Sequence, residues 1–125
     1  MEENIKQILI VEDDSFLLQM YTTKLTKAGY EVKSASDGIQ ALKKAKELKP
    51  DIILLDLLIP LKSGFEVLEE LKIDKNTQDI PVIVLSNMSE REDVQKCLQL
   101  GAVDYLIKAH FVPSEVISKI EKIIS

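Results

Sequence analysis

The side chains best suited to chemistry in this sequence directly follow short apolar runs. Glu12 and Asp13 follow ILIV, while the runs IILL, VIVL and YLI lead to Asp56, Ser86 and Lys108. Crowded carboxylates resist ionisation unless a cation shares them, and Mg²⁺ commonly binds one or two carboxylates together with a phosphate group. This set predicts a magnesium-dependent phosphoryl site. In it Asp56 would be the nucleophile, Lys108 would neutralise developing charge, and the Ser86 hydroxyl would donate to a phosphoryl oxygen.

The elements that must position these side chains alternate along the chain. Apolar runs predict strands at 8–11, 31–35, 51–55, 81–85 and 103–107, and apolar residues between and after them recur at helical spacings of three and four. Such alternation is typical of parallel sheets with right-handed crossovers and helices on both faces. We therefore expect an α/β fold with a doubly wound, five-stranded parallel sheet in the order 2-1-3-4-5. Ligands in that class bind beyond the carboxyl ends of the strands.

Local signals predict where several helices begin and end. Ser63–Glu66 and Ser89–Glu92 both match the capping box, in which the first and fourth residues satisfy amides at a helix start. Gly29 and Gly101 suit helix C-termini, and Pro113 suits a first helical turn because its missing amide proton is not needed there. These helix start and stop signals therefore agree with the helices predicted from the apolar pattern.

Length and composition indicate one ordinary globular domain. The chain has 125 residues, of which 46% are hydrophobic and 30% charged, and its single cysteine, Cys97, lies in a helical pattern that suits a buried structural thiol. Its formal net charge is -5, and Arg91 is the one arginine among 16 basic residues, so direct nucleic-acid binding is not expected. The polar, acidic start MEENIKQ does not match a signal peptide, and no apolar run approaches the length of a membrane span. We therefore expect a cytoplasmic protein without a membrane segment.

From about Ile5 to Ile124, the sequence resembles the response-regulator receiver domains of two-component signalling. ILIVEDD resembles the first strand and acidic pair of that family, and LLDLLIPLKSGFE resembles its phosphoacceptor strand and the proline-glycine loop that follows. PVIVLS and GAVDYLIK are similar to its hydroxyl strand and to its switch strand with the lysine. The resemblance implies a flavodoxin-like receiver fold and a single receiver domain over residues 1–125 without an output domain.

The resemblance also implies a role for each matching residue. The implied metal ligands are Glu12, Asp13, Asp56 and the backbone carbonyl of Leu58; the phosphoacceptor is Asp56; and the phosphoryl-binding and switch residues are Ser86, Tyr105 and Lys108. The implied cofactor is Mg²⁺, and the implied donor is a sensor histidine kinase or histidine phosphotransfer protein. Output is expected as contact with a downstream target or a second copy through the face formed by the fourth helix, fifth strand and fifth helix.

Two of these residues have plainer alternatives. Asp14, next to the acidic pair, is expected to cap the first helix or to face solvent, whereas Asp13 is assigned to the metal. Tyr105 could be a half-buried sheet aromatic with its hydroxyl in water, although its position in the motif favours the switch role. His110 lies in a loop segment, so the phosphohistidine is expected to come from a partner.

Three other functions compete with the receiver interpretation. A phosphohydrolase with an aspartyl-phosphate intermediate would need an acid-base aspartate two residues after the nucleophile, where this chain has Leu58, so no turnover of an outside substrate is expected. A flavodoxin-like mononucleotide binder would need a hydroxyl- and glycine-rich loop in place of VEDDS. A phosphorylation-independent pseudo-receiver stays open, because Ala109 and Asn87 replace the proline and the small residue usual in the family.

Overall fold

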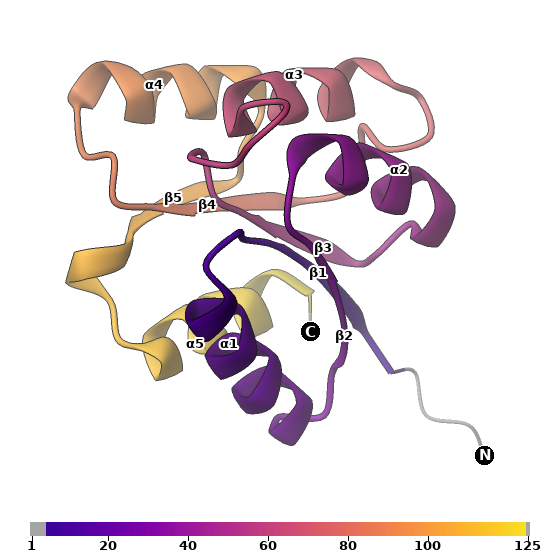
Figure 1. The fold of residues 1–125 in the computed structure, drawn as a ribbon, viewed down its shortest axis with the longest axis vertical. Coiled ribbons are helices and arrows are strands. Elements are labelled where there is room, and N and C mark those ends of the chain that lie inside the picture. Colours follow the sequence, from indigo (N-terminus) through magenta and orange to yellow (C-terminus); the bar gives the residue numbers. More distant parts are fainter. Residues whose placement is uncertain (1–4, 125) are drawn as a thin grey trace.

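A parallel β-sheet forms the centre of the structure, a computed structural model that describes residues 5–124 (Figure 1). Its strands are β1 (Gln7–Val11), β2 (Glu31–Ala35), β3 (Ile52–Leu55), β4 (Val82–Ser86) and β5 (Asp104–Ile107). Every neighbouring pair is parallel and the order is β2-β1-β3-β4-β5. The predicted topology is therefore confirmed.

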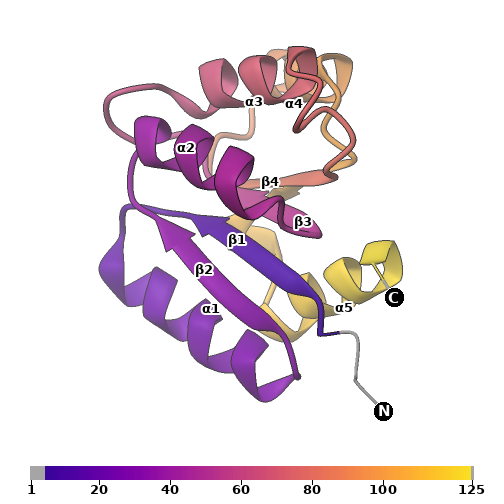
Figure 2. The same ribbon diagram turned by 90° about the vertical axis from the view of Figure 1, so that its right-hand side faces the viewer.

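The helices cover both faces of this sheet. They are α1 (Ser15–Lys27), α2 (Gly38–Leu48), α3 (Gly64–Ile73), α4 (Arg91–Leu100) and α5 (Pro113–Ile124), with a 3₁₀ turn, η1 (Lys108–His110), before the last. Figures 1 and 2 show α1 and α5 on one face and α2, α3 and α4 on the other. Within the described residues, no helix is long and apolar enough to cross a membrane.

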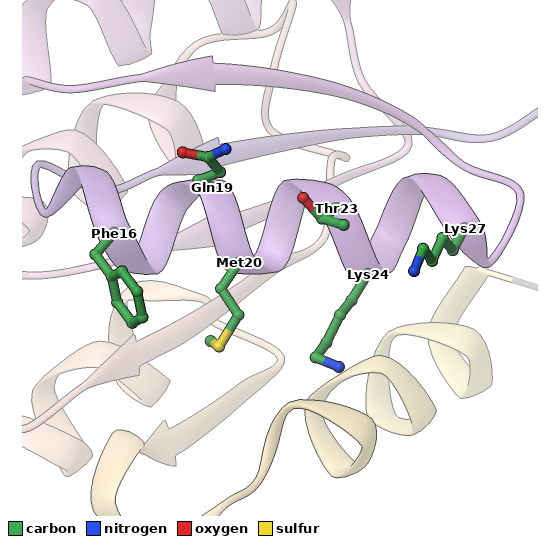
Figure 3. Close-up of a pocket in the computed structure, with 6 residues that line it drawn as sticks. All are labelled: Phe16, Gln19, Met20, Thr23, Lys24 and Lys27. Carbon is green, nitrogen blue, oxygen red and sulfur yellow. The ribbon is translucent and has the colours of Figure 1, made fainter.

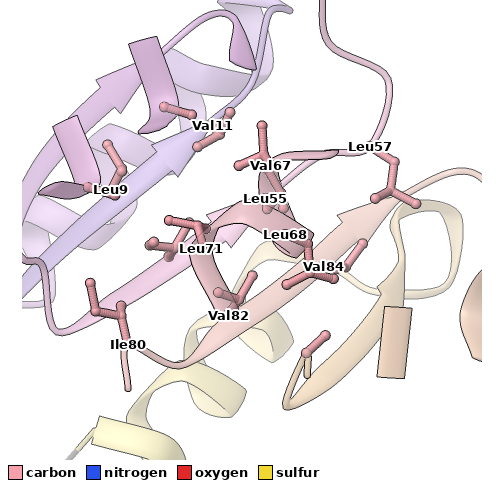
Figure 4. Packing of buried hydrophobic residues seen from close by; sticks show 14 of the residues in the cluster. Leu9, Val11, Leu55, Leu57, Val67, Leu68, Leu71, Ile80, Val82 and Val84 are labelled. Atoms are coloured by element: carbon pink, nitrogen blue, oxygen red, sulfur yellow. The ribbon is translucent and has the colours of Figure 1, made fainter. Parts of the chain in front are cut away.

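The core consists of two layers that share the inner strands. Alternate residues of β1 point to opposite faces, so Leu9 packs on the side of α2 and α3 while Ile10 packs on the side of α1 and α5. Figure 4 shows the first layer, in which strand side chains meet those of α3: Leu9, Val11, Leu55, Val82 and Val84 against Val67, Leu68 and Leu71. Every residue of β1 after Gln7, and all of β3 and β4, is buried, as expected for central parallel strands. Cys97 is buried in this same layer, as predicted.

One predicted capping box is present and the other is absent. Ser63 and Glu66 exchange both bonds, with Ser63 N–H donating to Glu66 Oε1 at 3.0 Å and Glu66 N–H donating to Ser63 Oγ at 3.2 Å. The box at Ser89 was wrong, because α4 begins one residue later, with Glu90 as N-cap and no side-chain cap bond. Glu92 therefore occupies the second position of the helix. There its charge interacts favourably with the helix dipole, but its side chain does not form the capping-box hydrogen bond. At the other end, Gly101 is left-handed and caps α4 as predicted.

The strand register determines which residues meet at the carboxyl edge of the sheet. Val11 pairs with Leu55, and the Asp56 N–H donates to the Val11 carbonyl at 3.0 Å, so Glu12 and Asp56 leave neighbouring strands at the same level. Ser86 pairs with Ile107 in the last pair of the β4–β5 register, so Lys108 directly follows β5 at the level where β4 ends. The sheet thus delivers four chemically active side chains to one edge.

Candidate functional site

Three carboxylates converge at this edge. Glu12, Asp13 and Asp56 each offer an oxygen, and these oxygens lie within 4.8 Å of one another. Glu12 and Asp56 are only 6% exposed, whereas Asp13 is exposed. Two ligands on opposite sides of a Mg²⁺ ion lie roughly 4.2 Å apart, so small side-chain adjustments could bring all three oxygens to one ion. The donor set, hard oxygens with one side open to solvent, fits a magnesium ion that keeps several waters.

Lys108 lies between two of these carboxylates. Its Nζ donates to Glu12 Oε1 at 2.7 Å and to Asp56 Oδ2 at 2.9 Å. Burial lowers the pKa of Lys108, but the hydrogen bonds to Glu12 and Asp56 outweigh it and the net shift is upward, so the ammonium stays charged. Burial raises the pKa of Glu12, the charge of Asp56 raises it further, and hydrogen bonds from Lys108 and the Asp14 N–H only partly oppose this. One ammonium thus compensates part of the charge of three carboxylates.

Backbone amides at the start of the two following segments support the buried carboxylates. The Asp14 N–H donates to Glu12 Oε2 at 3.1 Å, and the Leu58 N–H donates to Asp56 Oδ1 at 3.2 Å. Asp14 itself caps α1, because its side chain accepts from the Phe16 and Leu17 amides at 3.0 and 3.1 Å. The capping interpretation of Asp14 is therefore confirmed, and its side chain is directed to the helix rather than to the cluster.

Ser86 and Tyr105 both hydrogen-bond to the backbone of Met88, one at its N–H and the other at its carbonyl. The Met88 N–H donates to Ser86 Oγ at 3.3 Å, and the Tyr105 hydroxyl donates to the Met88 carbonyl at 2.6 Å. Ser86 is fully buried, while Tyr105 is partly buried and packs against the core layer that faces α3. Burial, followed by the neighbouring Cys97, raises the pKa of Tyr105 to about 12, so its hydroxyl keeps the proton that it donates. The Tyr105 hydroxyl is thus hydrogen-bonded to the protein backbone.

The two departures from the family pattern lie beside Lys108. No cis peptide bond occurs in residues 5–124, so the Lys108–Ala109 bond is trans, and Lys108 begins η1. Asn87 is exposed and lines a cavity of about 320 Å³ together with Lys108 and Ala109. Asn87 and Ala109, the two residues that depart from the family pattern, therefore line a cavity on the α1 side of Lys108.

A separate groove of about 490 Å³ runs along α1. It is lined by Phe16, Gln19, Met20, Thr23, Lys24 and Lys27, and Phe16, Met20 and Lys24 project from the same side of the helix (Figure 3). Its lining includes no carboxylate, and its charged groups are lysines at the far end of the helix. The groove is therefore not the cation site.

Comparison with known proteins decides the family. The model of the response regulator receiver domain matches residues 8–121. The chain belongs to the response regulator receiver family. It is 39% identical over 120 residues to the chemotaxis protein CheY of Thermotoga maritima, covering 94% of this receiver and 97% of that protein. It is equally 39% identical to the alkaline phosphatase synthesis regulator PhoP of Bacillus subtilis, covering 95% of this chain but only 48% of the relative.

Solved receiver structures show the same fold. The receiver domain of the sensor histidine kinase PA1611 from Pseudomonas aeruginosa has a TM-score of 0.87 and 32% identity, with 96% and 98% of the two chains covered. That structure holds a magnesium ion in its active-site cleft. The chemotaxis regulator CheY4 of Vibrio cholerae gives a TM-score of 0.87 at 29% identity, with 95% and 98% covered. The receiver fold predicted from the sequence is confirmed.

Sequence reasoning missed some interactions of this receiver site. It assigned Lys108 to the phosphoryl group alone, although here the ammonium binds Glu12 and Asp56. It assigned no role to the Met88 backbone, which no side-chain pattern could have revealed. Gly64 was recognised in a capping box and in the proline-glycine loop of the family, but its packing was not foreseen: a Cβ added there would lie 2.5 Å from Leu57 Cα and 2.6 Å from the Asp56 carbonyl oxygen. A glycine immediately inside a helix start was the available signal of such close approach.

We predict opposite stability changes for the two partners of the central ion pair in Mg²⁺-free protein. Asp56→Asn removes one of three crowded charges while keeping an oxygen for Lys108, and should raise the free energy of unfolding by about 1 kcal/mol. Lys108→Met leaves the carboxylates uncompensated and should lower the free energy of unfolding by about 3–5 kcal/mol. Urea unfolding with and without Mg²⁺ measures both differences, and each should shrink when the ion is added. A destabilised Asp56→Asn protein in the absence of metal would contradict a crowded acidic site.

Proposed function

We propose that this receiver is switched by a phosphoryl group transferred from a partner phosphohistidine to Asp56. The observation that carries the proposal is the pairing of Asp56 with Lys108 inside a cluster of three carboxylates. A nucleophilic carboxylate, a fixed ammonium and spare acidic ligands are the groups that metal-assisted phosphoryl transfer requires. The same arrangement has no evident purpose in a protein that only packs or docks.

Glu12, Asp13 and Asp56, together with the backbone carbonyl of Leu58, would hold the Mg²⁺ ion. The ion would supply positive charge to the phosphoryl oxygens, which the single Lys108 ammonium cannot fully provide. The magnesium in the related PA1611 receiver supports this assignment. Asp13 is exposed, so hydrated ions can reach the cluster from solvent.

The protein residues divide the work of transfer. An Asp56 carboxylate oxygen forms a bond to phosphorus as the P–N bond of the partner breaks, and the bonding pair returns to the histidine ring. The Lys108 ammonium, already within hydrogen-bond distance of Asp56, would then bind the phosphoryl oxygens and stabilise their negative charge. The Ser86 oxygen accepts from the Met88 N–H, so its own proton remains available for a phosphoryl oxygen.

The phosphohistidine must come from a histidine kinase or a histidine phosphotransfer protein. The one histidine of the chain, His110, is an exposed residue at the end of η1 and has no place in the cluster. Position 58 carries an exposed leucine that cannot act as the acid-base group of a phosphohydrolase. We therefore propose one transfer per activation and no turnover of an outside substrate.

Acetyl phosphate with Mg²⁺ should add a single phosphoryl group to the protein, and Asp56→Asn should abolish the adduct. Asp14→Asn is the matched control, because that residue caps α1 outside the cluster and asparagine caps equally well. Intact-mass measurement counts the adducts, and chelation of Mg²⁺ should prevent them. If folded protein gains no adduct even from a phosphorylated partner, the phosphorylation-independent interaction module becomes the better account.

We further propose that Met88 couples Ser86 to Tyr105 and so to the face formed by α4, β5 and α5. A phosphoryl oxygen that draws the Ser86 hydroxyl toward Asp56 would shift the Met88 N–H bonded to it. The Met88 carbonyl, held by Tyr105, would move with the same residue. Because a ligand biases a two-state element only through different contacts in the two states, these two hydrogen bonds are the natural points of action. The face would then bind a downstream target or a second copy.

Phosphorylation should therefore change amide hydrogen exchange beyond the acidic cluster, in residues 86–108. Ser86→Ala should still accept the phosphoryl group but lose most of this distant change. Ser89→Ala, which removes an exposed hydroxyl from the same connection, should respond like the parent. Exchange that changes only around Glu12 and Asp56 in the phosphorylated parent would disprove the coupling.

A further inference from the structure

The loop that follows Asp56 contains an unusual tight turn. Leu61 has a φ of 72°, and the Lys62 N–H donates to the Pro60 carbonyl at 2.9 Å, closing a three-residue turn around it. Turns of this kind with a left-handed central residue are rare and strained for a side chain such as leucine. Strain persists only where surrounding structure holds it, so an external contact must fix this turn.

That contact comes from α2, through Gly38. Its N–H donates to the same Pro60 carbonyl at 3.1 Å. A Cβ added to Gly38 would lie 2.3 Å from the Lys62 carbonyl oxygen and 2.5 Å from Lys62 Cβ, closer than real Cβ contacts come. The φ of Gly38 does not lie in the left-handed region, so the position needs glycine for close approach and not for its backbone conformation.

The turn is part of a short segment whose other end is also fixed. Leu58 donates to Asp56 Oδ1 at 3.2 Å, and the Gly64 N–H donates to the Leu57 carbonyl at 2.9 Å. Neither of these bonds restrains Pro60 or Lys62. On the outer half of the loop, the Lys62 side chain pairs with Glu70 and Ile59 packs against the core. Gly38 adds the contact that holds the backbone of the turn itself, in a loop whose inner half carries Leu58, a proposed carbonyl ligand.

We propose that Gly38 is a positioning residue for the Mg²⁺ and phosphoryl site. By lacking a side chain, it lets the start of α2 press against Pro60 and Lys62, and this contact sets the path of the loop between Asp56 and α3. The inference rests on the proposed function, because it assigns a purpose to a loop that would carry a metal ligand. It places control of metal affinity in a helix that contributes no ligand.

Gly38→Ala tests the proposal through metal affinity. Calorimetric titration with Mg²⁺ should give a dissociation constant about 10–100-fold higher than in the parent, the usual effect of disturbing a residue that supports metal ligands. Labelling of Asp56 by acetyl phosphate should need correspondingly more Mg²⁺, while its rate at saturating Mg²⁺ falls much less. Ile39→Ala, the next residue on α2 and 52% exposed, should bind Mg²⁺ like the parent.

A second pair of variants covers the case in which Gly38→Ala does not fold. Asp37 caps α2 by accepting from the Gln40 N–H at 2.7 Å, so Asp37→Ala should loosen the start of the helix and raise the dissociation constant several-fold. Asp37→Asn keeps the cap but removes the charge, and should bind Mg²⁺ like the parent. A parent that shows no saturable Mg²⁺ binding would overturn the proposed function itself. A parent that binds, beside Gly38→Ala or Asp37→Ala variants with unchanged affinity, would overturn only the role of Gly38.

Discussion

The confinement of three carboxylates around one ammonium is the constraint on which the rest of this receiver depends. Glu12 and Asp56 are almost fully buried, yet only Lys108 compensates them within the cluster, and Asp13 adds a third negative charge beside them. Burial of unpaired charge is costly, so the site is stable only with its hydrogen bonds intact and is improved by any added positive charge. The proposed affinity for a divalent cation, and through it for a phosphoryl group, follows from this imbalance.

The surrounding fold brings the three carboxylates together and connects them to a second surface. Parallel register brings the residues after β1 and β3 to the same level, and the exposed Asp13 opens this part of the sheet edge to solvent. The hydroxyl that would meet the phosphoryl group is tied through Met88 to Tyr105, on the strand that precedes Lys108. Under the proposed switch, a change of charge at Asp56 would reach a second surface through these two hydrogen bonds and the Met88 backbone.

The sequence predicted those features that arise from local pattern. Apolar runs located the strands, and their alternation with helices indicated a doubly wound parallel sheet, a class in which the order 2-1-3-4-5 is known. Residues at strand ends identified the acidic edge. The box at Ser63 was found because both of its partners are close in sequence. The box at Ser89 failed because four matching residues do not determine on which of them a helix begins.

Contacts between distant segments were beyond such reasoning. The bond from Lys108 to Glu12 joins residues that follow β5 and β1, two strands separated in the sheet by β3 and β4. The approach of Gly38 to Lys62 joins two separate crossovers. Both depend on tertiary packing to tenths of an ångström. A glycine or lysine in the sequence does not reveal which backbone or carboxylate will face it.

The most direct test of this account is a double-mutant cycle between Lys108 and Asp56. The free energy of unfolding would be measured in urea for the parent, Lys108→Met, Asp56→Asn and the double variant, each without and with Mg²⁺. The account predicts a favourable coupling of about 1–3 kcal/mol in metal-free protein, and a smaller one when Mg²⁺ shares the carboxylate charge. A metal-free coupling below about 0.5 kcal/mol, the usual limit for independent sites, would contradict it.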